Sequence, residues 1–224
     1  LAERGIDYEI IVVNDGSTDG TDRLVEELAS QNSRIHLINH PQNLGYGSAL
    51  RSGFERASLD YIFLMDSDGQ FDISDLDRFL PHIKEFNAII GYRKKRADPI
   101  VRSLNAWMYH IFIQQVFDLK AKDMDCAFKL FPRDIYRAIR PIESNGALFS
   151  AEFLLKFHMC GFSILEIPVR HFPRQFGTQT GASLRVIFKM FRECWSLKRE
   201  LDRTRTESQI QLNPGTLLGI NHMR

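Results

Sequence analysis

The sequence predicts an α/β protein with a mainly parallel sheet flanked by helices. Three observations support this class. Short apolar runs alternate with segments of helical periodicity. The runs are continuously apolar and rich in β-branched residues, as expected of strands buried on both faces. Polar, glycine-containing motifs follow directly after them, at the places where such sheets bind ligands.

The first half of the chain carries the alternation most clearly. The predicted strands are Tyr8–Asn14, Ile35–Asn39, Tyr61–Asp66 and Ala88–Gly91. The predicted helices between them are Thr21–Ser30, Gly47–Ala57 and Ser74–Phe86, the first with Leu24, Val25 and Leu28 on one face. A strand, a helix and another strand in regular order indicate parallel pairing.

After Gly91 the pattern changes. A basic loop, YRKKRADP, leads into further predicted elements: helix Val101–Phe117, strand Phe128–Phe131, helix Ser150–Cys160, strand Ser163–Val169 and amphipathic helix Leu184–Leu201. The segment from Arg203 is polar and has no periodic apolar face, so we expect residues 203–224 to be disordered. Residues 1–202 are predicted to form one domain.

Composition excludes several functional classes. The chain has 224 residues, 44% of them hydrophobic and 25% charged, which is typical of a soluble globular domain. A formal charge of +1 gives no nucleic-acid-binding signature, and no apolar run approaches the ~20 residues that span a bilayer. Cys126, Cys160 and Cys194 lack metal-ligand spacing and are interpreted as reduced, mostly buried thiols. We therefore expect a cytoplasmic protein, which could work at the cytoplasmic face of a membrane.

Polar motifs follow the first and second predicted strands. In NDGSTDGT, Asp15 and Gly16 supply a carboxylate and a permissive turn where a ribose or base could dock. In NLGYGSAL, Asn43, Gly45 and Gly47 could bring backbone close to a ligand at a helix start. Taken alone, NDGSTDGT is more typical of a turn followed by a helix cap.

The third predicted strand ends in MDSDGQ. Asp66 and Asp68 are separated by one residue, and Gln70 adds a neutral oxygen. Oxygen ligands in this arrangement suit Mg²⁺ or Mn²⁺ bridging a diphosphate, since such an ion keeps positions for phosphate and water. The alternative is that the two aspartates only cap the next turn.

These three motifs, followed by DMDCAFKLF, resemble family 2 glycosyltransferases of the GT-A fold, especially the dolichol-phosphate mannose synthase-like and polyprenyl-phosphate branch. The resemblance runs from Tyr8 to Arg192. It implies sugar transfer, with inversion, from a GDP- or UDP-sugar to an acceptor. It also implies that Asp15 contacts the nucleoside, that Asp66 and Asp68 contact ribose and metal, and that Gln70 can join the metal.

The resemblance leaves two kinds of acceptor open. A hydroxyl acceptor needs a base, which the family places at the position of Asp123, with Asp125 as a near rival. Ala127 replaces the family's glycine in this motif. A lipid phosphate, with its second pKa near ~6, needs no base.

Basic residues could hold a phosphate acceptor. Arg93 and Arg102 match phosphate-contacting positions of the family, and Arg174 lies in a glycine-containing loop. Lys94 and Lys95 are more typical of a solvated loop. The segment Arg174–Ala182 is either a lid over the substrates or a flexible loop without function.

Three further features have competing interpretations. His171 is more typical of a structural histidine than of a metal ligand, and Glu152 matches a glutamate of the family but equally fits a helix-start cap. The aromatic-rich stretch Asn105–Phe117 is either core or a face toward a membrane, and Leu184–Leu201 is a second candidate for peripheral membrane contact.

Family members have a strand before the one that corresponds to Tyr8–Asn14, and its loop holds the nucleobase. We therefore expect the chain to be N-terminally incomplete and to bind its donor poorly. An inactive binding remnant is the competing class. A sugar nucleotidyltransferase is disfavoured because no Gly-rich, Lys/Arg-bearing loop follows the first predicted strand.

Overall fold

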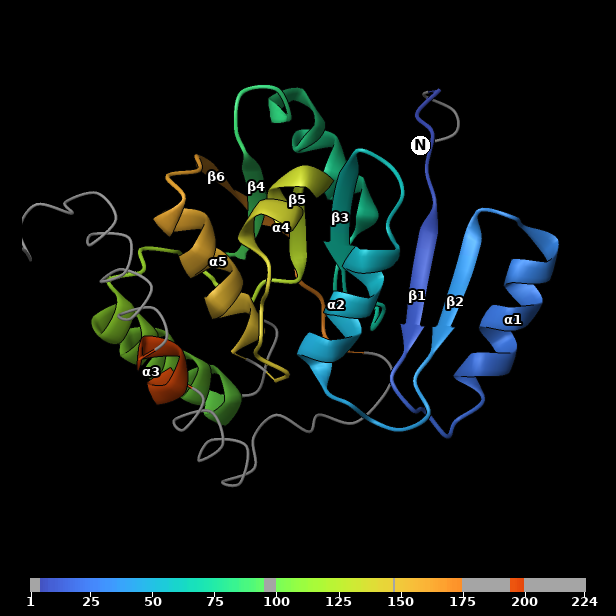
Figure 1. Ribbon diagram of the computed structural model, residues 1–224, viewed down its shortest axis with the longest axis horizontal. Helices are drawn as coiled ribbons and strands as arrows, with labels where there is room; N and C mark the ends of the chain where they lie inside the picture. Colours follow the sequence, from blue (N-terminus) through green and yellow to red (C-terminus); the bar gives the residue numbers. More distant parts are fainter. Residues whose placement is uncertain (1–4, 95–99, 147, 175–193, 200–224) are drawn as a thin grey trace, which may run out of the picture.

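The computed structural model describes residues 5–94, 100–146, 148–174 and 194–199. It confirms an α/β protein with strands flanked by helices (Figure 1). The strands are β1 (Ile10–Asn14), β2 (Ile35–Asn39), β3 (Tyr61–Met65), β4 (Ala88–Arg93), β5 (Phe128–Pro132) and β6 (Ile164–Val169). The helices are α1 (Thr21–Gln31), α2 (Tyr46–Arg56), α3 (Ile100–Phe117), α4 (Arg133–Ile139) and α5 (Phe149–Met159), with 3₁₀ helices η2 (Ile73–Arg78) and η3 (Leu80–His82).

The strands run in one direction except β5. β1 pairs with β2 in parallel, and a second group has the order β3-β5-β4-β6, in which β5 is antiparallel to both neighbours. β4 and β6 are parallel. Because β5 is reversed, its first residue lies at the edge of the sheet where the other strands end. The turn before β5 therefore reaches the ligand-binding edge expected of the parallel strands.

Between β1 and β3 the described residues form no backbone ladder, so the sheet is in two parts. β1, β2 and β3 point the same way in Figure 1. The Glu9 carboxylate, just before β1, accepts hydrogen bonds from the backbone nitrogens of Ser58 and Leu59 and from the Ser58 hydroxyl, just before β3. These bonds hold the starts of β1 and β3 together. Among the described residues, each of these two strands has one edge that is not paired with another strand.

One predicted helix is wrong. Residues 74–86 form η2 and η3 instead of a continuous α-helix. Pro81 is the physical reason, because its ring lacks a backbone N–H and clashes with the preceding turn of an α-helix. Asp72 caps η2 by accepting bonds from the Ser74 backbone nitrogen and hydroxyl. The short helix α4, directly after β5, was not predicted.

The core lies on both faces of the larger sheet. On one face α2 and α5 cover an aromatic cluster in which Phe54, Phe131 and Phe153 pack edge-on or tilted. On the other face Phe128 packs against Phe79 and Phe63. Residues of β5 therefore alternate between the two faces, which places Lys129 and Phe131 on the side of α2 and α5.

Several expectations fall on residues outside the described ranges. Of the predicted helix Leu184–Leu201, residues 194–199 are described and are helical. Most of the segment Arg174–Ala182 and all of residues 203–224 lie outside. Cys126 and Cys194 are buried as expected, whereas Cys160 is exposed. Among the described helices, none is both long and apolar enough to cross a membrane.

Candidate active site

Polar side chains gather where the parallel strands end and where β5 begins. Asp15 follows β1, Asp66 and Asp68 follow β3, and Arg93 is the last residue of β4. The turn Asp123–Cys126, closed by a bond of 3.3 Å from the Cys126 nitrogen to the Asp123 carbonyl, precedes β5. Four segments that are far apart in the sequence therefore supply one candidate site.

Asp15 joins the first two of the predicted binding motifs. Its Oδ1 accepts the Leu44 backbone N–H at 2.9 Å and its Oδ2 accepts that of Gly45 at 2.9 Å. His40 Nδ1 lies 2.7 Å from the same Oδ1, and His40 Nε2 lies 2.8 Å from the Ser52 hydroxyl. Partial burial opposes ionisation of Asp15, but the bonds from His40, Leu44 and Gly45 outweigh it and lower the pKa. Asp15 is thus an ionised group held within the loops.

The sequence interpretation missed His40. It lies in INHPQN, in the first position after β2. A histidine directly after a predicted strand was the signal that could have identified it as a site residue. Its ring bridges Asp15 and Ser52 of α2. The loop after β1 is therefore anchored to a helix as well as to the loop after β2.

The glycines serve close packing between loops. Gly16 has a φ of +74°, and a Cβ there would lie 2.6 Å from the Asn43 backbone nitrogen. A Cβ on Gly47 would lie 2.3 Å from the Ser144 carbonyl oxygen. Gly45 has a φ of +101°, and a Cβ there would lie 2.5 Å from the Asn145 carbonyl oxygen. These contacts are with the chain itself, while Asn43 is exposed at the edge of the site.

Asp66 and Asp68 form the acidic centre of the site. Burial, followed by the neighbouring Asp68 charge, raises the pKa of Asp66 to about 6, although Lys129, Arg174 and Arg93 act in the opposite direction. Asp68 Oδ2 accepts a bond of 2.7 Å from Arg174 Nη2. Arg174 Nε is buried and has no partner among the described residues. The expected phosphate-binding arginine is therefore beside the expected metal-binding aspartate.

Gln70 turns toward the segment that follows β6. Its side-chain Nε2 donates to the Phe172 carbonyl at 3.1 Å, and the Phe172 N–H donates to the Gln70 carbonyl at 2.9 Å. Buried Asp75 accepts bonds from the Arg170 backbone and guanidinium at 2.7 and 3.1 Å. These bonds hold residues 170–174 alongside residues 68–75. The nearby His171 ring packs edge-on against Phe71.

Asp123 forms a bidentate ion pair with Arg93. Arg93 Nε lies 2.6 Å from Asp123 Oδ2, and Nη2 lies 2.7 Å from Oδ1. Asp123 is only 9% exposed, and the Arg93 side chain is also buried. Burial opposes the charge on Arg93, but Asp123 raises its pKa above the ordinary value. Such a pairing favours the carboxylate form of Asp123.

Asp125 is less buried than Asp123, and its charge acts on a tyrosine beside the acidic centre. The link is Tyr46, whose hydroxyl is 3.5 Å from Asp66 Oδ1. Part of the Tyr46 side chain is exposed, but protein atoms enclose its hydroxyl. This burial, with the Asp66 and Asp125 charges, raises the pKa of Tyr46 well above its usual value. Tyr46 was not identified from the sequence.

Glu152 is described by the structure, whereas the expectation for Arg102 is not tested by the described residues. Glu152 is fully buried and accepts bonds of 2.9 Å from the backbone nitrogens of Glu143 and Ser144, with Lys156 Nζ at 2.8 Å. It thereby fixes the loop against which the start of α2 packs. Arg102 belongs to α3, but its side chain is outside the described part, as are Lys95 and Arg96, and Lys94 is exposed.

The acidic centre fits a divalent cation as a two-carboxylate site. Within the described ranges, no group of three or more histidine, cysteine, aspartate or glutamate side chains has a metal-binding arrangement. Asp66 and Asp68 nevertheless lie on one turn, where burial and then the Asp68 charge raise the pKa of Asp66. A hard cation held by two carboxylates keeps its other positions for phosphate oxygens and water.

Comparisons with known proteins agree on one family. The sequence model described as Glycosyl transferase family 2 matches residues 1–140. A dolichyl-phosphate beta-glucosyltransferase of Trichomonas vaginalis is 30% identical over 176 residues, covering 72% of this chain and 52% of the relative. An undecaprenyl-phosphate mannosyltransferase of Micrococcus luteus is 25% identical over 179 residues, covering 75% of this chain and 74% of the relative.

A solved structure supports the fold. Glucosyl-3-phosphoglycerate synthase from Mycobacterium tuberculosis, crystallised with Mn²⁺, UDP-glucose and phosphoglyceric acid, has a TM-score of 0.54 at 19% identity, covering 82% of this chain and 68% of that one. This likeness confirms the expected GT-A fold. The chain spans 44%, 28% and 52% of the length of three of the curated relatives that it matches.

Proposed function

This chain belongs to glycosyltransferase family 2, and from that premise we propose that it transfers a sugar from a GDP- or UDP-sugar to a polyprenyl phosphate. The observation that carries the proposal is the meeting of two groups at one sheet edge: the Asp66–Asp68 turn and the Arg93–Asp123 ion pair. The names of the Trichomonas and Micrococcus relatives favour a lipid-phosphate acceptor.

On the donor side, Asp66 and Asp68 would hold Mg²⁺ or Mn²⁺, which supplies positive charge for the leaving nucleoside diphosphate. The Mn²⁺ complex of the mycobacterial synthase supports this assignment. Arg174, already at Asp68, adds a second positive charge, and its unpartnered Nε could donate to a phosphate oxygen. Asp15 and its loops would line the nucleoside side of the site.

On the acceptor side, the Arg93–Asp123 pair favours phosphate over hydroxyl. A carboxylate bound at both oxygens by a buried guanidinium is a poor proton acceptor, because protonation would cost the ion pair. A phosphate nucleophile is already ionised near neutral pH and needs no base. If the acceptor were a saccharide or glycolipid hydroxyl, Asp125 would be the better-placed base.

A lipid acceptor requires contact with a membrane surface, and three exposed apolar side chains support one. Trp107 and Met108 of α3 are 59% and 57% exposed, and Trp195 is 61% exposed. The guanidinium of Arg199 lies 5.7 Å from the centre of the Trp195 ring. Tryptophan next to a basic group suits the headgroup region of a bilayer. We include this peripheral contact in the proposal.

The deciding experiment supplies the protein with membranes and radiolabelled GDP- and UDP-sugars. Label in an organic-soluble, mild-acid-labile product is expected, and the Asp68→Asn variant should not form it. Label in a water-soluble saccharide, or in a glycolipid that is stable to mild acid, would move the acceptor to a hydroxyl. Binding of UDP or GDP with Mn²⁺ but no transfer to any acceptor would favour the inactive binding remnant.

A further inference from the structure

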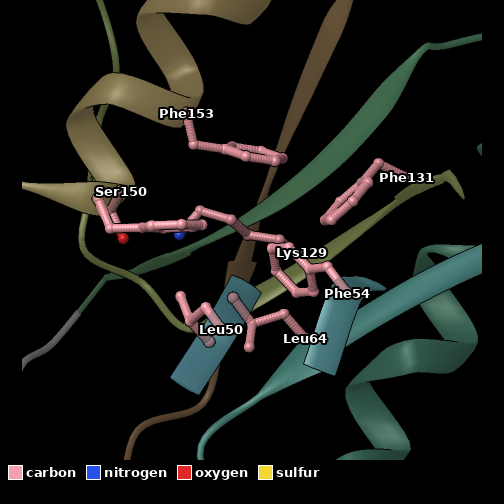
Figure 2. A pocket seen from close by; sticks show the side chains of 8 residues that line it. Leu50, Phe54, Leu64, Lys129, Phe131, Ser150 and Phe153 are labelled. Atoms are coloured by element: carbon pink, nitrogen blue, oxygen red, sulfur yellow. The ribbon is translucent and has the colours of Figure 1, made fainter. Parts of the chain in front are cut away.

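Lys129 is a lysine inside the apolar core. It is 2% exposed and lies in the middle of β5, opposite Leu64 of β3 and Ile90 of β4. Figure 2 shows its side chain among apolar residues that line a small pocket beneath α2 and α5, including Phe54, Phe131 and Phe153. An ammonium group in such surroundings costs several kcal/mol unless it is well paired. Its partners therefore indicate why this residue is a lysine.

The ammonium group binds the backbone on both sides of Asp125. Lys129 Nζ donates to the Met124 carbonyl at 3.1 Å and, by a shorter bond, to the Cys126 carbonyl. These two carbonyls belong to the residues directly before and after Asp125. Binding both holds the peptide unit before Asp125 and the one after Cys126, and so fixes the short segment from which the Asp125 side chain projects. Lys129 itself is buried in the core, where it lines the pocket beneath α2 and α5.

The charges around Lys129 agree with this placement. Burial lowers the pKa of Lys129, and Cys126, Asp125 and Asp123 act in the opposite direction. The positive charge of Lys129 in turn opposes the rise in the pKa of Asp66. The buried ammonium group of Lys129 therefore acts on the acidic residues at the sheet edge, in addition to Arg93.

We infer that Lys129 is a positioning residue, which holds the Asp123–Cys126 turn and thereby sets the orientation of Asp125 toward the acceptor. The two carboxylates of this turn are then fixed by different cations. Arg93 binds the Asp123 side chain, and Lys129 binds the backbone around Asp125. The acceptor part of this inference rests on the proposed glycosyltransferase function.

The test replaces Lys129 by methionine, which keeps the length and apolar stem but cannot donate to the carbonyls. The control is Phe153→Leu, which removes volume from the same pocket without touching the turn. Amide hydrogen exchange in peptides covering residues 119–128 is expected to rise by about tenfold or more in Lys129→Met. Phe153→Leu should leave that peptide unchanged, even where its melting temperature falls equally.

Transfer kinetics give the second readout. Lys129→Met should lower kcat by about 10²-fold, the scale expected when the turn that carries Asp123 and Asp125 on the acceptor side is displaced, while the donor KM stays within about threefold. Lys129→Gln, which retains one donor group, should be intermediate in both measurements and serves if the methionine variant does not fold. Calorimetric binding of UDP with Mn²⁺ should be alike in all variants.

Two outcomes of the exchange measurement would overturn the inference. One is that residues 119–128 of Lys129→Met exchange their amide hydrogens at the rate of the unmodified protein. The other is that Phe153→Leu raises the exchange rate of these residues as much as Lys129→Met does. A fall in donor affinity matching the fall in kcat would also reject a role confined to the acceptor turn. If the unmodified protein transfers no sugar, the proposed function fails, but the exchange measurement still decides whether Lys129 holds the turn.

Discussion

Arg93 and Asp123 bind each other at three points. Besides the two guanidinium bonds of 2.6 and 2.7 Å, the Arg93 backbone N–H lies 3.2 Å from Asp123 Oδ2. The last residue of β4 is thereby joined to the turn before β5, 30 residues away. Each residue was expected to act on the acceptor separately, but the structure shows them as one unit.

Disrupting either partner alone should leave a buried charge without its bidentate partner. We expect Arg93→Met and Asp123→Asn each to lower the free energy of unfolding by about 3 kcal/mol. The double variant should lose less than the sum, with a coupling of at least about 1 kcal/mol in urea denaturation. The exposed pair Arg137–Asp134, at 3.2 Å, is the control and should show coupling below about 0.5 kcal/mol. If the losses in the free energy of unfolding from Arg93→Met and Asp123→Asn simply add in the double variant, the two residues do not act as one unit.

Asp68→Asn should impair cation binding more than folding. Removing one of two carboxylate charges is expected to weaken Mn²⁺ binding in the presence of UDP, measured by calorimetry, and to lower turnover by about two to three orders of magnitude. Asp72→Asn is the matched control, because Asp72 lies in the same loop but caps η2. Equal Mn²⁺ affinity in the two variants would reject Asp68 as a ligand.

The strand-end motifs were predictable because their signals are local. Asp66 and Asp68 directly follow an apolar run, and their position at the sheet edge required only the knowledge that the run is a parallel strand. Pro81 was also readable as a helix breaker, and the continuous helix Ser74–Phe86 was predicted despite it. The bonding of Gln70 to Phe172 joins residues 102 positions apart, and nothing near Gln70 indicates it.

Lys129 could not be identified for a different reason. In the motif DMDCAFKLF it looks like the polar position of an ordinary strand, which would place it toward solvent. Its burial depends on β5 lying between β3 and β4 with α2 and α5 above it, and that order follows from tertiary packing. The pairing of Asp123 with Arg93 depends on the same reversed strand.

The two-part sheet predicts uneven protection of backbone amides. β5 and β4 are each paired along both edges, whereas β1 and β3 are each paired along one edge among the described residues. In hydrogen exchange followed by NMR, amides of β5 and β4 should exchange slowest, and alternate amides of β1 and β3 should exchange with little protection. Uniform protection of β1 and β3 would mean that another strand covers their edges.

The exposed tryptophans predict binding to vesicles. Trp195→Ser should weaken sedimentation with vesicles containing anionic phospholipid by about tenfold, corresponding to the lost insertion of one large apolar side chain. Trp107→Ser should act similarly. Leu24→Ser on α1 is the control, since Leu24 is an equally exposed apolar residue at 59% but lies on a different helix. Equal effects at Leu24 and Trp195, or none at either tryptophan, would remove the proposed membrane face.

Glu152 predicts a specific dependence of stability on pH. Burial opposes its ionisation, but the bonds from Lys156, Ser144 and Glu143 outweigh burial and lower its pKa below 4.5. A carboxylate whose pKa is lower in the folded than in the unfolded state stabilises the fold above the unfolded pKa. This stabilisation is lost as pH falls through the folded pKa. The unmodified protein should therefore lose stability on acidification below about pH 4.5.

Glu152→Gln should remove that part of the acid sensitivity. At pH 7 we expect it to cost about 3 kcal/mol, because Lys156 loses its charged partner and one loop N–H loses its acceptor. The difference from the unmodified protein should shrink as pH falls from 5 to 3 in denaturation experiments. Glu143→Gln is the control, since only its backbone N–H bonds Glu152 and its side chain is exposed. A constant difference between Glu152→Gln and the unmodified protein across this pH range would show that Glu152 is not ionised in the fold, and that the loop beside α2 is held by neutral hydrogen bonds.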